Sequence, residues 1–339
     1  MADKQNDFFK IEDHFKETEN IPSIPVFENH LTEVPRFTIA IPTYKRNKYL
    51  REALESAIDQ ITNEPYEIIV VDNNPERGDD TEMLMTRYKD VKGLSYYKNS
   101  ENLGMTGNFN RLYTLSRTEW VIMLHDDDLI LSDFIDFHSK VIKEIPDADF
   151  IYPSFYCSNR KKVNRPKNKY YKLRITDFIL DNPAGAPLGM MARKRSIIRL
   201  GGFRDRLYPS IDYDLYARAV YNGFKSIKII SSPKAMYRFE VNESLKEETI
   251  LGFYQNHQDI SEVILNGINS ISKAYYTQCH NQYFPNLLNA WKTLTMNKIE
   301  SLEKTLEKAI RKQTLVSRTI FVTHSIIFRI RQKKLGVPR

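Results

Sequence analysis

Three consecutive carboxylates, Asp126, Asp127 and Asp128, follow the apolar run Trp120–Leu124 after a single histidine, His125. Adjacent carboxylates repel one another unless a cation offsets their charge, and carboxylate oxygens are common ligands of divalent cations. A solvated acidic turn, capping a helix that begins near Ser132, is the alternative interpretation. Because the triplet lies at the end of an apolar strand, it is a candidate site for a divalent cation.

Two earlier apolar runs, residues 37–41 and 67–71, also end on polar residues. In an open parallel sheet, ligands bind beyond the carboxyl ends of the strands. Three polar or acidic strand ends therefore predict one binding site at one edge of a sheet. The residues that join the aspartate triplet there are Pro42, Thr43, Tyr44 and Asp72.

The elements that position these residues follow from the spacing of apolar side chains. Short apolar runs alternate with segments of helical periodicity, which predicts βαβ units and a mostly parallel sheet flanked by helices. The fold class is therefore α/β. We expect strands near residues 37–41, 67–72, 94–98, 120–124, 150–156, 226–230 and 235–239, and helices near 47–60, 79–88, 107–116, 132–145 and 212–222. Residues 160–174 read as a basic loop, and the pattern from about residue 245 onward is helical.

Composition excludes several classes of protein. The chain has 339 residues, 41% of them hydrophobic and 27% charged, so it can bury a sizeable core. Its two cysteines, Cys157 and Cys279, can form neither a disulfide framework nor a cysteine-based zinc site. No apolar run approaches the roughly 18 residues of a membrane span, and the first residues lack a signal-peptide core. We expect a cytoplasmic protein whose membrane contact, if any, is peripheral, at the inner face.

The net charge of +7 raises the question of a nucleic-acid partner. The basic residues gather in residues 160–174 and at the C-terminus, without a recognised nucleic-acid-binding motif. No nucleic-acid partner is therefore expected.

Five short motifs occur in the order found in family 2 glycosyltransferases, and residues 36–245 resemble that family. They are Ile41–Arg46, Val71–Asn74, Asn102–Gly104 with Asn108, Leu124–Asp128, and Gly201–Phe203 followed by Asp212–Leu215. The resemblance implies a GT-A fold and an inverting, metal-dependent transfer of a sugar in a single displacement. The donor would be a nucleotide-diphosphate sugar, a UDP-sugar, and the acceptor a glycan or lipid-linked molecule of cell-surface polysaccharide synthesis.

The resemblance also implies a role for each site residue. Asp127 and Asp128 would hold the metal, Mn²⁺ or Mg²⁺, and Asp212 would be the general base, with Asp214 as the competing candidate. The residues that would bind the nucleotide sugar are Pro42, Thr43, Tyr44, Asp72, Asn102, Gly104, Asn108 and Asp126.

Two departures from the family pattern leave a second function open. Ile211 replaces the usual glutamate before the base, and the segment Tyr237–Glu240 lacks its usual histidine. Glu240 would be the replacement for that histidine, and Arg238 would face the diphosphate. The alternative is a non-catalytic glycosyltransferase-like subunit that binds nucleotide sugar or scaffolds a complex. A nucleotidyltransferase is disfavoured and a dehydrogenase excluded, because the turn after the first strand carries no glycine-rich loop.

The same resemblance divides the chain. Residues 1–35 would be an N-terminal arm, 36–130 a nucleotide-binding half, 131–245 an acceptor half, and 246–339 a helical extension. Lys308–Arg339 contains nine lysines or arginines, no acidic residue, and interspersed apolar residues. Such a helix suits an anionic membrane surface. Packing on the catalytic domain or in a homodimer is the alternative.

Overall fold

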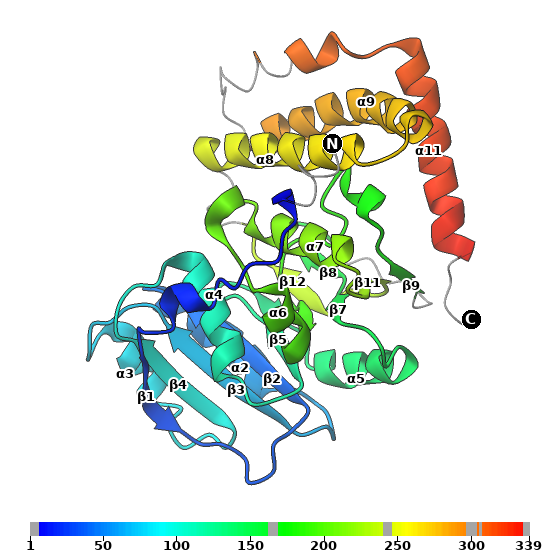
Figure 1. The fold of residues 1–339 in the computed structure, drawn as a ribbon. Helices are drawn as coiled ribbons and strands as arrows, with labels where there is room; N and C mark the ends of the chain where they lie inside the picture. The colour runs from blue at the N-terminus through cyan, green and yellow to red at the C-terminus, as the bar shows by residue number, and fades with distance from the viewer. Residues whose placement is uncertain (1–6, 162–168, 240–245, 296–303, 305–306, 335–339) are drawn as a thin grey trace.

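The computed structural model describes residues 7–161, 169–239, 246–295, 304 and 307–334 (Figure 1). Its centre is a nine-stranded sheet with the order β1-β4-β3-β2-β5-β10-β7-β11-β9. The strands are β1 (Ser23–Glu28), β2 (Phe37–Thr43), β3 (Tyr66–Asp72), β4 (Leu94–Asn99), β5 (Trp120–Met123), β7 (Phe150–Tyr152), β9 (Lys169–Lys172), β10 (Met191–Arg193) and β11 (Ser226–Ile230). A second sheet of three strands contains β6 (Leu129–Ile130), β8 (Phe155–Cys157) and β12 (Ala235–Tyr237).

The direction of the strands confirms the predicted α/β class with a mostly parallel sheet. Strands β4, β3, β2 and β5 pair in parallel, and β7 pairs in parallel with β11. Strands β1, β9 and β10 pair antiparallel with their neighbours. In the β2–β3 register Thr43 lies opposite Asp72, so the carboxyl ends of these strands meet at one edge of the sheet.

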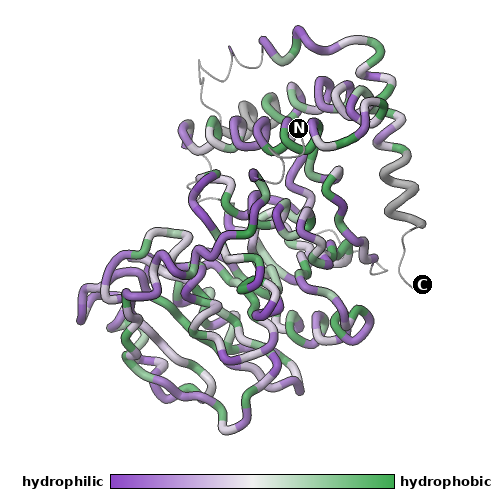
Figure 2. Tube along the Cα trace, in the orientation of Figure 1, coloured by the Kyte–Doolittle hydropathy of each residue, from purple (hydrophilic) through white to green (hydrophobic). Residues whose placement is uncertain are grey.

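Helices cover both faces of the large sheet. They are α2 (Asn47–Ile58), α3 (Asp80–Thr86), α4 (Gly104–Leu115), α5 (Phe134–Glu144), α6 (Lys194–Leu200) and α7 (Ile211–Tyr221). Successive side chains of a strand point to opposite faces. Ile39 and Ile41 therefore pack with α2, α3 and α5, whereas Ala40 packs with α4, α6 and α7. Figure 2 shows the resulting apolar interior of the sheet.

The N-terminal residues are bound to both halves of the α/β region. Strand β1 extends the sheet by pairing with β4. Phe9 is fully buried, and Arg204 donates a hydrogen bond to the Phe8 carbonyl at 2.8 Å. The N-terminal segment at Glu12 passes so close to Gly201 that a Cβ on Gly201 would lie 1.7 Å from the Glu12 carbonyl oxygen. The Gly201-Gly202 motif is thus needed where this segment packs.

Three C-terminal helices form a layer at one end of the molecule, coloured yellow to red in Figure 1. They are α8 (Glu247–Asn266), α9 (Ser270–Thr295) and α11 (Leu315–Lys334). Helix α8 is joined to the α/β region by hydrogen bonds from Ser261 to the Ile179 carbonyl, 2.7 Å, and from Asn256 to the Leu207 carbonyl, 2.8 Å. Helix α11 packs along α9. None of the helices in the described ranges combines the length and apolarity of a membrane span.

The strands and helices differ from the sequence predictions in a few places. The strand expected over residues 150–156 is divided into β7 and β8, because Pro153 between them has no backbone N–H to donate. The basic loop expected over residues 160–174 contains the edge strand β9, while residues 162–168 lie outside the described residues. Strands β1 and β10 and helix α6 were not expected from the apolar pattern.

Candidate active site

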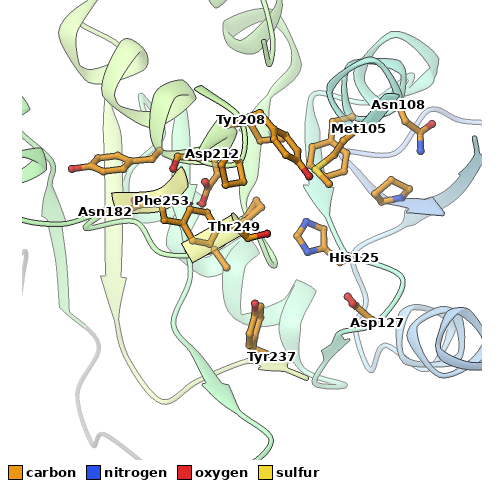
Figure 3. A pocket seen from close by; sticks show the side chains of 18 of the residues that line it. Met105, Asn108, His125, Asp127, Asn182, Tyr208, Asp212, Tyr237, Thr249 and Phe253 are labelled. Carbon is orange, nitrogen blue, oxygen red and sulfur yellow. Dashed lines mark hydrogen bonds between the residues drawn. The ribbon is translucent and has the colours of Figure 1, made fainter. Parts of the chain in front are cut away.

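A cavity of about 850 Å³ opens at the carboxyl edge of the large sheet (Figure 3). The ends of β2 and β5 and the start of α4 form one side. The start of α7, the loop after residue 180 and helix α8 form the other. Most of the predicted site residues line it together: Pro42, Thr43, Tyr44, Asn102, Gly104, Asn108, Asp126, Asp127 and Asp212. The predicted residues Asp72 and Asp128 lie behind its wall.

Asp72 is held in the sheet rather than at the cavity surface. Its side chain is fully buried and accepts hydrogen bonds from Tyr96 Oη at 2.8 Å, Lys98 Nζ at 2.9 Å and the Asn74 backbone N–H at 2.9 Å. The sequence prediction placed Asp72 against the nucleotide. The structure instead satisfies this carboxylate with donors from the neighbouring strand β4, and Asn73 is the residue of this strand end that lines the cavity.

Asn73 organises the loop that leads into α4. Its Nδ2 donates to Asn102 Oδ1 at 2.7 Å and to the Gly104 carbonyl at 3.0 Å. Its Oδ1 accepts from the Leu103 N–H at 2.9 Å and from Asn99 Nδ2 at 3.0 Å. Gly104 has a φ of 69°, which favours glycine, and open space where a Cβ would be. The backbone of this loop is therefore fixed by side-chain amides.

Asn108 and Tyr44 occupy different parts of the cavity wall on the side of the sheet. Asn108 is buried, accepts from Asn99 Nδ2 at 2.9 Å and donates to the Val71 carbonyl at 3.3 Å. The Tyr44 ring is 44% exposed, with the Lys45 ammonium 5.4 Å from its centroid. The first residue stiffens the wall, whereas the second leaves an aromatic face open to a ligand.

The three triplet carboxylates point to different partners. Asp126 accepts from Thr43 Oγ1 at 2.7 Å. Asp127 pairs with Arg46, whose Nη1 lies 2.5 Å from Asp127 Oδ2. Asp128 is buried, and its Oδ1 accepts from the backbone N–H of Arg238 at 2.8 Å. Sequence reasoning placed all three at one strand end, and in the structure each has a different hydrogen-bond partner, although Arg46 also lies 3.8 Å from Asp126.

Burial, with a smaller contribution from neighbouring carboxylates, raises the pKa values of two aspartates at this strand end. Burial, reinforced by the Asp127 charge, raises the pKa of Asp126 to about 6. Burial also raises the pKa of Asp128. For His125, burial lowers the pKa, but the interaction with Asp128 and the charges of the other aspartates outweigh it and raise the pKa overall. A cation bound here would relieve this repulsion.

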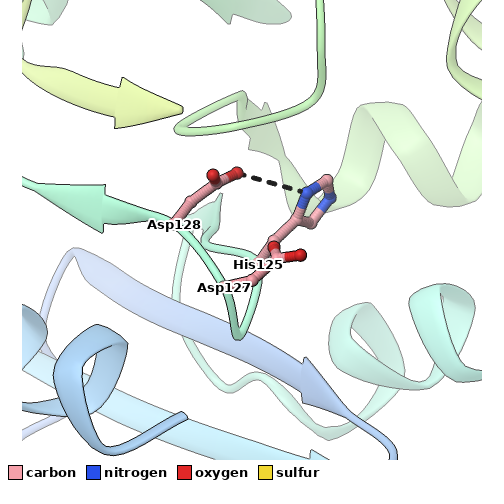
Figure 4. Close-up of side chains that lie close together, drawn as sticks. All are labelled: His125, Asp127 and Asp128. Carbon is pink, nitrogen blue, oxygen red and sulfur yellow. Dashed lines mark ion pairs between the residues drawn. The ribbon is translucent and has the colours of Figure 1, made fainter. Parts of the chain in front are cut away.

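A divalent cation fits the residues at this point. His125, Asp127 and Asp128 each offer a ligand atom, and these atoms lie within 4.8 Å of one another (Figure 4). Metal–ligand bonds of about 2.0–2.3 Å place opposite ligands of one ion roughly 4–4.6 Å apart. Asp128 Oδ2 is also buried with no hydrogen-bond partner among the described residues. The cluster therefore has both the size and the unsatisfied oxygen that a metal site needs.

Asp212 faces the cavity from the first turn of α7 (Figure 3). Asn182 Nδ2 donates to its Oδ2 at 3.2 Å, and burial raises the pKa of Asp212 to about 6. A carboxylate with a pKa near neutrality suits a general base. Asp214, the competing candidate, is fully buried and bonded to Arg204 and Arg218.

The residues at the departures from the family pattern are only partly described. Ile211 is buried at the start of α7. Arg238 does not line the cavity, because its Nε donates to the Asp127 carbonyl at 2.9 Å and its guanidinium pairs with Glu52. Glu240 lies outside the described residues.

Several lining residues were missed by sequence reasoning. Three of them, Arg46, Asn73 and His125, lie within the family-like motifs named above. Their position next to predicted site residues could have identified them. Asn182 and Tyr208 come from loops without a motif. Helix α8 adds an apolar wall that no local pattern connects with the sheet edge: Thr249, Ile250, Phe253 and His257.

Comparison with known proteins gives a consistent result. The family model described as Glycosyl transferase family 2 matches residues 38–245. An uncharacterized glycosyltransferase of Methanocaldococcus jannaschii is 24% identical over 228 residues, 65% of this chain and 78% of that protein. One from Haemophilus influenzae is 22% identical over 228 residues, 66% of this chain and 70% of that protein.

Solved structures share the fold. The crystal structure of Staphylococcus aureus TarS 1–349 in complex with UDP-GlcNAc superposes with a TM-score of 0.58 at 18% identity, covering 86% of this chain and 91% of that chain. The same protein in complex with UDP gives a TM-score of 0.54, again at 18% identity and with the same coverage of both chains.

Proposed function

The chain belongs to glycosyltransferase family 2, and from this premise we propose that it transfers a sugar from a UDP-sugar to a hydroxyl of a glycan or lipid-linked acceptor, with inversion at the anomeric carbon. One observation carries the proposal. A single cavity joins an acidic strand end with a metal-compatible cluster to an aspartate of raised pKa that enters from the other half of the domain. A single displacement needs charge neutralisation at the leaving group and a base at the acceptor.

The donor side is proposed to hold the nucleotide. Tyr44 offers an aromatic face for the base, and the loop fixed by Asn73 offers backbone and amide groups for the ribose and phosphates. Asp126, oriented by Thr43, is assigned to the ribose. The UDP-GlcNAc and UDP complexes of TarS, which shares the fold, support a uridine nucleotide as the donor's leaving group.

The divalent cation is proposed to be Mn²⁺ or Mg²⁺, held by Asp127 and Asp128. When bound, such a cation neutralises the charge that develops on the diphosphate leaving group. Arg46 pairs with Asp127 and lines the cavity, so its guanidinium is placed to contact the diphosphate as well.

Asp212 is proposed to remove the proton from the acceptor hydroxyl. The acceptor oxygen forms a bond to the anomeric carbon while the bond from that carbon to the phosphate oxygen breaks. The proton passes to Asp212, and UDP leaves with the electron pair. Asn182 holds the carboxylate in position through its 3.2 Å hydrogen bond.

We propose that the protein reaches its acceptor at the anionic surface on the inner face of a membrane. Helix α11 leaves Leu315 81% exposed, and Val322 and Ile326 are more than half exposed. Arg318, three residues after Leu315 on the same helix, is exposed, and so is Arg311, which precedes the helix. Apolar residues flanked by basic ones match the chemistry of an anionic lipid surface. Because one face of α11 already packs on α9, a second copy of the chain is the other occupant to test.

The function is tested by measuring UDP release from a panel of UDP-sugars with Mn²⁺, with and without saccharide acceptors. A glycosyltransferase releases UDP, slowly to water and faster to its acceptor. A non-catalytic subunit would be stabilised against heat by a donor, because ligands that bind the folded state raise its stability. It would release no UDP. That second result would overturn the proposed transfer while leaving donor binding intact.

A further inference from the structure

His125 lies directly before the acidic triplet (Figure 4), and its imidazole lines the same cavity (Figure 3). The Phe109 ring stacks against it, with ring centroids 5.7 Å apart and planes inclined by 19°. This stacking, from helix α4, fixes the plane of the imidazole.

The contact between His125 and Asp128 is not a hydrogen bond. Nδ1 of the imidazole lies 3.6 Å from Oδ2 of Asp128, which is beyond the usual range of N–H···O distances. Both Asp128 Oδ2 and His125 Nε2 are buried without a hydrogen-bond partner among the described residues. Asp128 is only 1% exposed, so bulk solvent does not reach its free oxygen. Buried polar atoms normally have a partner.

A shared cation accounts for this geometry. Two adjacent ligands of one metal ion, each at about 2.1–2.3 Å, lie roughly 3.0–3.3 Å apart. The 3.6 Å gap needs only a small adjustment to reach that separation. Asp127 completes the cluster, with all ligand atoms within 4.8 Å of one another. The ion pair with Arg46 uses Oδ2 of Asp127, one of the two oxygens of that carboxylate.

We propose that His125 is a ligand of the divalent cation, together with Asp127 and Asp128, and that its imidazole makes the site prefer Mn²⁺ to Mg²⁺. The inference rests on the proposed function, since it concerns the cation of the same site. Mg²⁺ is a hard ion that takes oxygen ligands and keeps several waters. Mn²⁺ also takes oxygen ligands, but as a first-row transition-metal ion it accepts an imidazole nitrogen more readily than Mg²⁺ does. A site with both nitrogen and oxygen ligands should therefore bind Mn²⁺ in preference to Mg²⁺.

The test measures metal binding without sugar transfer. Free Mn²⁺ is counted by electron paramagnetic resonance while the protein is titrated, and Mg²⁺ is added as a competitor. His125→Gln removes the nitrogen ligand, and His125→Asp replaces it with an oxygen. The matched control is His14→Asn, which changes a histidine that is bonded to Glu17 outside the cavity.

We expect His125→Gln to weaken Mn²⁺ binding at least about tenfold, the low end of the loss seen even for residues that only support metal ligands. His125→Asp should shift the Mn²⁺ to Mg²⁺ affinity ratio toward Mg²⁺, and His14→Asn should bind like wild type. Unchanged Mn²⁺ affinity and an unchanged ratio in both His125 variants would overturn the proposal. If neither variant folds, wild-type protein decides. Pulsed resonance of bound Mn²⁺ should show coupling to an imidazole nitrogen, and its absence would overturn the assignment.

These outcomes are independent of sugar transfer. Wild-type protein that binds no Mn²⁺ but still transfers sugar would remove the metal site and keep the function. Protein that binds Mn²⁺ through nitrogen but releases no UDP from any UDP-sugar would keep the metal site and overturn the function.

Discussion

Asp212 and Asp214 lie two residues apart in the first turn of α7, yet only Asp212 faces the cavity. Residues two apart on a helix are separated by about 200° around its axis. Asp214 therefore points into the protein, where Arg204 and Arg218 bond to its carboxylate. Two carboxylates that are equivalent in the sequence motif thus have different chemistry.

Asp212→Asn should retain donor binding and lose transfer. The amide keeps the shape of the side chain but cannot take a proton, and a general base typically contributes about 10²–10⁴-fold to the rate. Steady-state rates with acceptor and a separate UDP-sugar binding titration distinguish the two effects. An active Asp212→Asn variant beside an inactive but folded Asp214→Asn variant would reverse the assignment.

Asp214→Asn should lower the free energy of unfolding. Removing one partner of a buried charge network leaves uncompensated charge, at a cost of about 3–5 kcal/mol. Both arginines that contact Asp214 are buried, so solvent does not replace the lost carboxylate. Urea unfolding of wild type and variant measures the difference. A change below about 1 kcal/mol would show that Asp214 does not anchor these arginines.

The rate of transfer should depend on the ionisation of Asp212. Burial raises the pKa of Asp212 to about 6, so its base form predominates above that pH and is lost as the pH falls through it. At subsaturating acceptor, kcat/KM should fall about tenfold per pH unit below 6 and level off above about 7. Rates between pH 5 and 8 test this, with UDP affinity over the same range as the control. A flat profile with constant UDP affinity would argue against Asp212.

Removal of the chain from Lys308 onward should weaken binding to anionic vesicles while leaving donor binding unchanged. The segment contributes nine basic residues and no acidic one, and each basic residue near an anionic surface contributes roughly 1 kcal/mol, less in high salt. Co-sedimentation with anionic and neutral vesicles measures the effect. Equal, weak binding by both proteins would exclude the membrane role. A change in oligomeric state on truncation would instead identify a second copy as the partner of α11.

Much of the donor side followed from local sequence. Apolar runs that end on polar residues mark strand ends, and the parallel connection brings those ends together, so Thr43, Asp126 and Asp127 were predicted at one edge. Asp72 shows the limit of that reasoning. Its buried position depends on Lys98 and Tyr96, which face it from the neighbouring strand, and no local pattern reveals such a partner.

The acceptor side was less predictable for the same reason. Helix α8 reaches the cavity only because residues 247–266 pack back onto the segment near Ile179, more than 60 residues earlier in the chain. Strand β1 likewise depends on its pairing with β4 across Ser23 and Asn99. The positions of α8 and β1 depend on contacts between segments that are distant in the sequence. The spacing of apolar residues within one segment does not predict such contacts.

The most direct test of the account is UDP release from a UDP-sugar donor, measured for wild type and Asp127→Asn with Mn²⁺ or with EDTA. The account predicts that wild type releases UDP only when a divalent cation is present. It also predicts that Asp127→Asn is slower by roughly a hundredfold or more, the scale of losing one electrostatic stabiliser. Full activity of the Asp127→Asn variant in EDTA would contradict it.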